Sequence, residues 1–191
     1  PRNVRWRFRP PHVCQPLATT SSQSSNLIVC SSTLARHLTQ VEALSMDLVS
    51  AFAAHRIAAR TFQLDAIAVA AARHGATALH LFGSLGRQSA DALSDIDVWL
   101  TFPDDAIDNA IDRRHDLYGE IGDVLLTHEM AGNRPLGGVY SLVLYQTIAG
   151  PTQVDWYLAP QRTSRIDPLW TLVYERVPLP RGEWQLDFSA Q

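Results

Sequence analysis

Two carboxylates, one residue apart, follow a glycine and a serine near the middle of the chain. Gly83 and Ser84 come directly after an apolar run, and Asp95 and Asp97 come after ten further residues. Because side chains on a strand alternate between its faces, Asp95 and Asp97 are expected to point to the same side. Paired carboxylates repel each other unless a cation lies between them, and a Gly-Ser turn that opens a helix is suited to bind an anion. The pattern therefore predicts a site for a metal-bound nucleoside triphosphate, and with it phosphoryl or nucleotidyl transfer.

A third carboxylate is expected from a later strand. Asp155 lies in an alternating segment, residues 153–158, whose apolar side chains share the opposite face. Asp123 and Glu129 are the alternative third carboxylates, but neither stands in so regular an alternation. Arg87 lies on the same turn as the Gly-Ser pair and could neutralise phosphate charge.

Three other side chains are expected close to these carboxylates. Trp99 shares the face of the aspartate pair, and it either walls the acceptor or nucleotide pocket or packs beneath the late hairpin. Tyr157 has the same two possible roles beside the third carboxylate. The seven histidines show no metal-ligand spacing, so His80 is expected to be a strand residue near the site and not a ligand.

Strands and helices in alternation are expected to position these residues. Apolar spacing predicts a helix over residues 61–75, capped by Thr61 and ended by Gly75, and a less regular helix over residues 34–58. Another helix is expected between residues 103 and 122, and a short helical piece near residues 167–175. Strands are expected at residues 78–82, 95–102, 123–127, 140–147 and 153–158, the last two paired as a hairpin. This order predicts an α/β (α+β) fold with a mixed sheet of about five strands and helices packed on one face.

Taken together, Gly83, Ser84, Asp95, Asp97 and the late Asp155 resemble the signature of the DNA polymerase β-like nucleotidyltransferase superfamily. The resemblance covers roughly residues 61–158. It is nearest to the small bacterial nucleotidyltransferase domains, which include the minimal nucleotidyltransferases and the domains of antibiotic adenylyltransferases. The gap between the second and third aspartates is long for a minimal nucleotidyltransferase, and it leaves room for an added strand.

The resemblance implies a role for each of these residues. Asp95, Asp97 and Asp155 would bind magnesium, in two ions, and Asp155 would either bind one metal or accept the proton of the acceptor hydroxyl. Gly83 and Ser84, together with Arg87, would hold the phosphates of the triphosphate.

The expected function is the magnesium-dependent transfer of a nucleoside monophosphate, AMP from ATP in the first instance, to a hydroxyl of a small molecule or protein. The family's antibiotic-modifying members carry a helical C-terminal domain, whereas only residues 159–191 follow the last expected strand here. The acceptor is therefore expected to be held by this domain alone, by a homodimer mate or by a small helical partner protein. The alternative functions are an antitoxin-like regulatory partner of a helical toxin and a catalytically degenerate domain that binds nucleotide without turnover.

Composition limits the other function classes. The 191 residues carry a formal net charge of -3, which argues against binding nucleic acid through bulk electrostatics. No apolar run approaches the ~20 residues needed to cross a bilayer, so no membrane is expected and the cytoplasm is the expected location. The only two cysteines, Cys14 and Cys30, lie in the first 30 residues, which excludes a disulfide framework or a cysteine zinc site in the core, and they are interpreted as incidental thiols.

Composition also divides the chain. Residues 1–45 are expected to be a disordered or non-native extension, because residues 1–33 are rich in Arg, Pro and Ser without visible period, and translation is expected to start at Met46. Residues 46–165 are expected to form the nucleotidyltransferase domain. Residues 166–191 are expected to wrap over its surface.

Overall fold

The computed structural model describes residues 26–184 and 186, with side chains described from Met46 onward. Contacts divide the chain into two compact units at Ser45 and Met46. The described residues of the first unit belong to helix α1 (Asn26–Arg73), which starts inside the segment where the sequence shows no period. The expectation of disorder for residues 1–25 lies outside the described residues.

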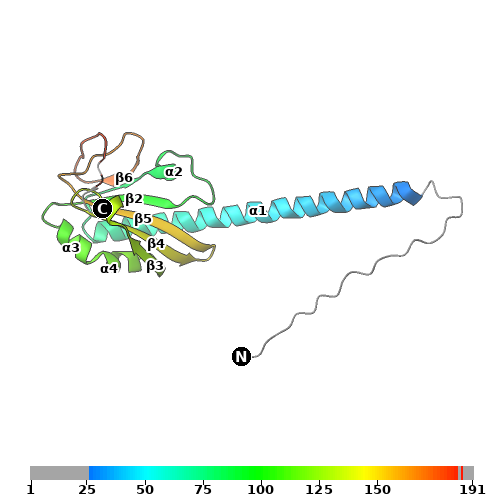
Figure 1. The fold of residues 1–191 in the computed structure, drawn as a ribbon, viewed down its shortest axis with the longest axis horizontal. Helices are drawn as coiled ribbons and strands as arrows, with labels where there is room; N and C mark the ends of the chain where they lie inside the picture. The colour runs from blue at the N-terminus through cyan, green and yellow to red at the C-terminus, as the bar shows by residue number, and fades with distance from the viewer. Residues whose placement is uncertain (1–25, 185, 187–191) are drawn as a thin grey trace, which may run out of the picture. The chain divides into compact units, whose positions relative to one another are not determined.

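Helix α1 is continuous where the sequence predicted two helices (Figure 1). Residues 59 and 60 are helical, and Thr61 is not an N-cap, because its hydroxyl donates to the carbonyl of Ile57 at 3.0 Å within the helix. The cause is composition: residues 26–73 contain neither Gly nor Pro, and Ala and Arg at the expected break favour helix. Gly75, with φ +88, follows the end of α1 as expected.

The fold is α+β, with a six-stranded mixed sheet in the order β3-β4-β5-β2-β1-β6 (Figure 1). Strands β2 and β5 are parallel, and every other neighbouring pair is antiparallel. The five predicted strands and the β4–β5 hairpin are confirmed. Their bounds are β1 (Ala78–Leu81), β2 (Ile96–Phe102), β3 (Asp123–Glu129), β4 (Val139–Thr147) and β5 (Gly150–Pro160).

The sixth strand, β6 (Thr171–Glu175), stands where the sequence predicted a helical piece, and that prediction is wrong. Its Thr, Val and Tyr favour an extended chain. It pairs antiparallel with β1, whose second edge would otherwise leave backbone groups unpaired.

The remaining helices are short. A single turn, α2 (Gly83–Gly86), follows β1, and the helix predicted between residues 103 and 122 is two pieces, α3 (Ile107–Asp112) and α4 (Arg114–Gly119). A 3-10 turn, η1 (Ala131–Asn133), lies between β3 and β4. Among the helices of residues 26–184, none is long and apolar enough to span a membrane.

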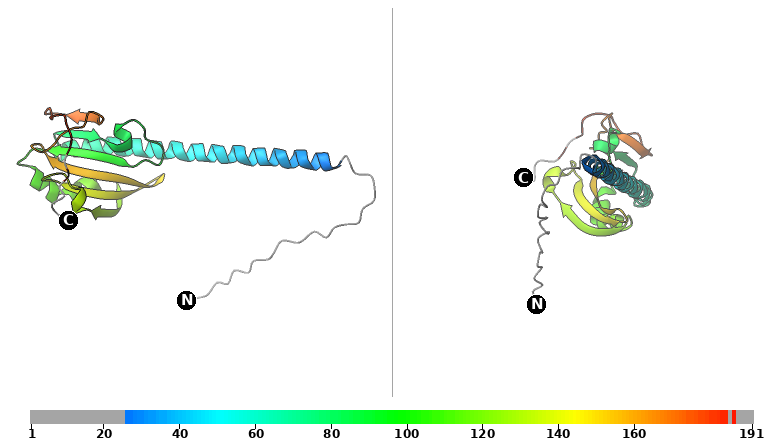
Figure 2. Two further views of the ribbon diagram at one scale, coloured as in Figure 1. Left: turned by 45° about the horizontal axis from the view of Figure 1, so that its top comes forward. Right: turned by 90° about the vertical axis from the view of Figure 1, so that its right-hand side faces the viewer.

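The sheet separates two cores, and the part of α1 that belongs to the second unit lies on one side of it (Figure 2). The first core joins α1, α3 and α4 to the sheet through Ile67, Val98 and Trp156, among other side chains, so the helices cover one face as predicted. On the opposite face, Trp99 and Tyr157 pack with residues of the C-terminal segment, including Trp170, Leu179 and Trp184. The alternation predicted for β2 is thereby confirmed, because Ile96, Val98, Leu100 and Phe102 face the first core.

Candidate metal and nucleotide site

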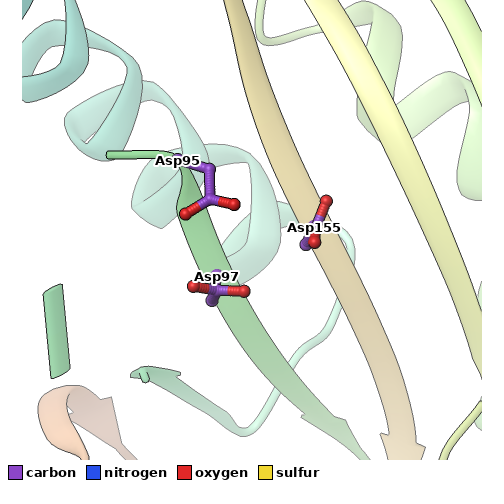
Figure 3. A group of neighbouring side chains, drawn as sticks. All are labelled: Asp95, Asp97 and Asp155. Atoms are coloured by element: carbon purple, nitrogen blue, oxygen red, sulfur yellow. The ribbon is translucent and has the colours of Figure 1, made fainter. Parts of the chain in front are cut away.

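The three aspartates come together because β2 and β5 are adjacent parallel strands. In their register Asp97 stands directly opposite Asp155, and Asp95 precedes the first residue of β2. One carboxylate oxygen from each residue lies within 4.8 Å of the other two, and all three residues are half-buried. Figure 3 shows their side chains gathered on these two strands.

Burial and mutual repulsion make this cluster unfavourable while it holds only negative charge. Burial raises the pKa of Asp97 to about 7, with further contributions from the charges of Asp95 and Asp155, while Arg87 acts in the opposite direction. Burial also raises the pKa of Asp155. Three carboxylate oxygens this close, short of positive charge, are a donor set that fits a divalent cation such as Mg²⁺.

The Gly-Ser turn lies against the second aspartate. The Phe82 N–H donates to the Asp97 carbonyl at 3.2 Å, which ties the end of β1 to β2. Gly83 follows with φ +60, and a Cβ placed there would collide with the Asp97 carboxylate. Only glycine therefore allows this approach.

Ser84 carries a buried hydroxyl that has no hydrogen-bond partner among the described residues. Buried polar atoms in folded proteins are normally satisfied, so this oxygen is available to a ligand that the protein alone does not supply. Arg87, three residues further on, is exposed and close enough for its charge to act on Asp97. All six predicted site residues thus lie on β2, on the residue just before it, on β5 or in the turn after β1.

The rival carboxylates are not part of this cluster. Asp123 and Glu129 lie on the edge strand β3, which β4 separates from β5. Glu129 accepts a hydrogen bond from Arg114 at 2.6 Å. Their positions leave Asp155 as the third carboxylate of the cluster.

Trp99 does not wall a pocket, so that alternative is wrong. It is only 1% exposed, and its indole donates to the Ser164 hydroxyl at 3.4 Å. It lies against Trp170 and Trp184 of the C-terminal segment and also against the β4–β5 hairpin, as the other alternative predicted. Tyr157 is stacked on it and is also buried.

His80 is fully buried on β1, and burial lowers its pKa to about 4. The prediction that it is a strand residue is confirmed.

Two side chains that touch the third carboxylate were missed by the sequence reasoning. Gln153 donates its side-chain amide to Asp155 Oδ1 at 2.8 Å, and the Tyr140 hydroxyl is also hydrogen-bonded to Asp155. Gln153 could have been found, because residues i and i+2 share a strand face. Tyr140 could not, because its contact depends on the register between β4 and β5.

The C-terminal segment also contributes to the site. The Thr171 hydroxyl donates to the carbonyl of Gly86 at 2.9 Å, at the end of α2. The Trp170 ring stacks on Phe82, with ring centroids 4.9 Å apart. These contacts hold the turn that contains the unpartnered serine hydroxyl, so part of the segment predicted to wrap the surface supports the site.

No protein-family model matches the chain, and a search of curated proteins finds no significant match. The function therefore has to be inferred from the chemistry of the site itself.

Proposed function

We propose that this protein is a magnesium-dependent nucleotidyltransferase with a polymerase β-like fold, which transfers AMP from ATP to an acceptor hydroxyl. The observation that carries the proposal is the cluster of Asp95, Asp97 and Asp155 on adjacent parallel strands, with Gly83 in contact with Asp97. Three carboxylates and a glycine turn with an unpartnered hydroxyl suit a metal–triphosphate complex better than either component alone.

The three aspartates would hold the magnesium, and the bound metal would supply electrostatic stabilisation of the charge on the triphosphate. The Ser84 hydroxyl and the backbone at Gly83 would donate to phosphate oxygens. Arg87 would neutralise phosphate charge at the exposed side of the turn. Together these groups would hold the donor at the end of β1 and the start of β2.

In the proposed reaction the acceptor oxygen forms a bond to the α-phosphorus, and the bond from that phosphorus to the bridging oxygen breaks. Pyrophosphate leaves with the electron pair of that bond. Asp155 would either bind one metal or accept the proton of the acceptor hydroxyl. Nucleoside triphosphates and magnesium are abundant in the cytoplasm, which is the location proposed for this activity.

The test is transfer from ATP labelled at the α-phosphorus or the γ-phosphorus, with the protein and candidate hydroxyl acceptors, in magnesium or in EDTA. Nucleotidyl transfer moves the α-label to the acceptor and releases the γ-label as pyrophosphate. Replacement of Asp95 or Asp97, as in Asp97→Asn, is expected to reduce transfer at least about 100-fold. Asp123→Asn, which removes a carboxylate from the edge strand, is the matched control and is expected to leave the rate unchanged.

Transfer of the γ-label, or transfer that ignores both EDTA and Asp97→Asn, would contradict the proposal. Magnesium-dependent ATP binding without transfer to any acceptor would instead indicate the degenerate nucleotide-binding domain. Transfer to a co-purified helical protein alone would indicate the regulatory partner role.

A further inference from the structure

We propose that Gln153 and Tyr140 are positioning residues that orient Asp155 and thereby set the metal affinity of the site. This inference rests on the proposed function, because it assumes that the aspartate cluster binds a divalent cation. It concerns two side chains that donate hydrogen bonds to one carboxylate from two different strands.

Gln153 donates a hydrogen bond to one oxygen of the Asp155 carboxylate. It lies two residues before Asp155 on β5, so both side chains stand on the same face of the strand. Its amide donates to Oδ1 at 2.8 Å, a short and therefore well-formed hydrogen bond. The side chain is half-buried, so water competes only in part for this contact.

Tyr140 approaches the same carboxylate from β4. Its register partner is Tyr157, two residues beyond Asp155, so Tyr140 and Asp155 form a diagonal pair on one face of the sheet. The ring is 2% exposed and packs against Tyr157 with centroids 4.8 Å apart. Its hydroxyl, held by this packing, donates to Asp155.

These two donors limit how the carboxylate can rotate. With Oδ1 engaged by Gln153, Asp155 keeps an oxygen near Asp95 and Asp97 and within the 4.8 Å cluster. Hydrogen-bonded partners of metal ligands orient those ligands, and removal of such a partner typically weakens metal binding by about 10- to 100-fold. Among the residues that the structure describes, no group donates a hydrogen bond to the carboxylate of Asp95 or Asp97, so the third carboxylate is the one whose position is fixed from outside the cluster.

The experiment measures Mn²⁺ binding to the full chain without nucleotide, by electron paramagnetic resonance of free Mn²⁺. Gln153→Met keeps the length of the side chain and much of its packing but cannot donate. Gln153→Ala removes both the packing of the side chain and its hydrogen-bond donor. Tyr140→Phe removes only the hydroxyl, so it tests the second donor independently.

The matched controls make the same substitutions away from the cluster. Gln146→Met changes an exposed glutamine on β4, and Tyr145→Phe removes a hydroxyl from the opposite face of that strand. Thermal unfolding of every variant shows whether it is folded.

The inference predicts that Gln153→Met weakens Mn²⁺ binding by about 10-fold or more, as does Gln153→Ala, and that Tyr140→Phe weakens it in the same direction. Both controls should bind as the wild type does. Wild-type affinity in folded Gln153→Met and Tyr140→Phe would overturn the positioning roles while leaving the proposed function intact. Rescue by Gln153→Met of a loss seen in Gln153→Ala would show that packing is what matters, and it would also overturn the role of the donor. Absence of Mn²⁺ binding in the wild type would overturn the proposed function along with this inference.

Discussion

Asp97→Asn should stabilise the metal-free protein at neutral and alkaline pH, although it removes a central residue of the proposed site. The asparagine keeps the shape of the side chain but carries no charge beside Asp95 and Asp155. Both the cost of burying the Asp97 charge and the repulsion within the cluster therefore disappear.

The size of the effect follows from the pKa of Asp97, which is about 7 in the folded protein against an ordinary 3.8. A difference of about three pH units corresponds to roughly 4 kcal/mol of unfolding free energy. Coulomb repulsion between two unit charges at the 4.8 Å upper limit of the cluster, at an effective dielectric constant of about 20, is of similar size, roughly 3 kcal/mol.

The sign follows from the raised pKa. Between about pH 4 and pH 7 the folded state holds a proton on Asp97 that the unfolded state has lost, so the wild type loses stability as pH rises through this range. The advantage of Asp97→Asn should therefore be roughly 4 kcal/mol at about pH 8 and below about 1 kcal/mol at about pH 4.

Urea unfolding of the full chain in EDTA, at several pH values across this range, measures the difference between the variant and the wild type. Mg²⁺ should stabilise the wild type and have much less effect on Asp97→Asn, because binding to the folded state alone raises stability. Asp123→Asn is the control, since that carboxylate lies outside the cluster on the sheet edge. Equal stability of Asp97→Asn and wild type at about pH 8, or a difference that does not change with pH, would refute the reasoning.

Three further predictions test the surroundings of the site. Gly83→Ala should reduce ATP affinity at least about 10-fold and lower the melting temperature, because its Cβ collides with the Asp97 carboxylate at a positive φ; normal ATP binding by calorimetry would contradict this. The wild type should lose stability as pH falls from about 6.5 to about 4, because the pKa of His80 is lowered to about 4 in the folded protein, and His80→Phe should remove this loss. The unfolding free energies of variant and wild type should therefore differ by roughly 3 kcal/mol more near pH 4 than at neutral pH, and a pH-independent difference would count against the prediction. Thr171→Val should weaken ATP binding by a few fold, about 1 kcal/mol, through loss of the hydrogen bond to Gly86, whereas Thr61→Val on α1 should have no effect on binding.

The local sequence pattern was sufficient to predict the strands that carry the site. Alternation along residues 96–102 predicted correctly that Val98 faces one core while Asp97 and Trp99 face the other side of the sheet. The predicted hairpin of β4 and β5 is also present, although its two-residue turn is Ile148-Ala149 and the Gly150-Pro151 pair that indicated a turn begins β5. Each of these features depends on residues within one strand or one turn.

The local sequence pattern failed to predict structure that depends on contacts with residues far away in the chain. Strand β6 forms because β1, about ninety residues earlier, has a free edge, and no property of residues 171–175 alone reveals that edge. Trp99 is buried because Trp170 and Trp184 cover it, whereas its own strand would leave it equally able to line a pocket.

The sequence by itself determined the chemical types at the site, their faces on the strands and the glycine that must precede the serine. Those properties follow from strand alternation and from the steric freedom of glycine, which act over a few residues. Only the tertiary structure decided that Asp155, and not Asp123 or Glu129, completes the cluster, and that Gln153 and Tyr140 hold it. The physical reason is that the parallel pairing of β2 and β5, and the register of β4 against β5, are set by the packing of both sheet faces, to which the whole described domain contributes.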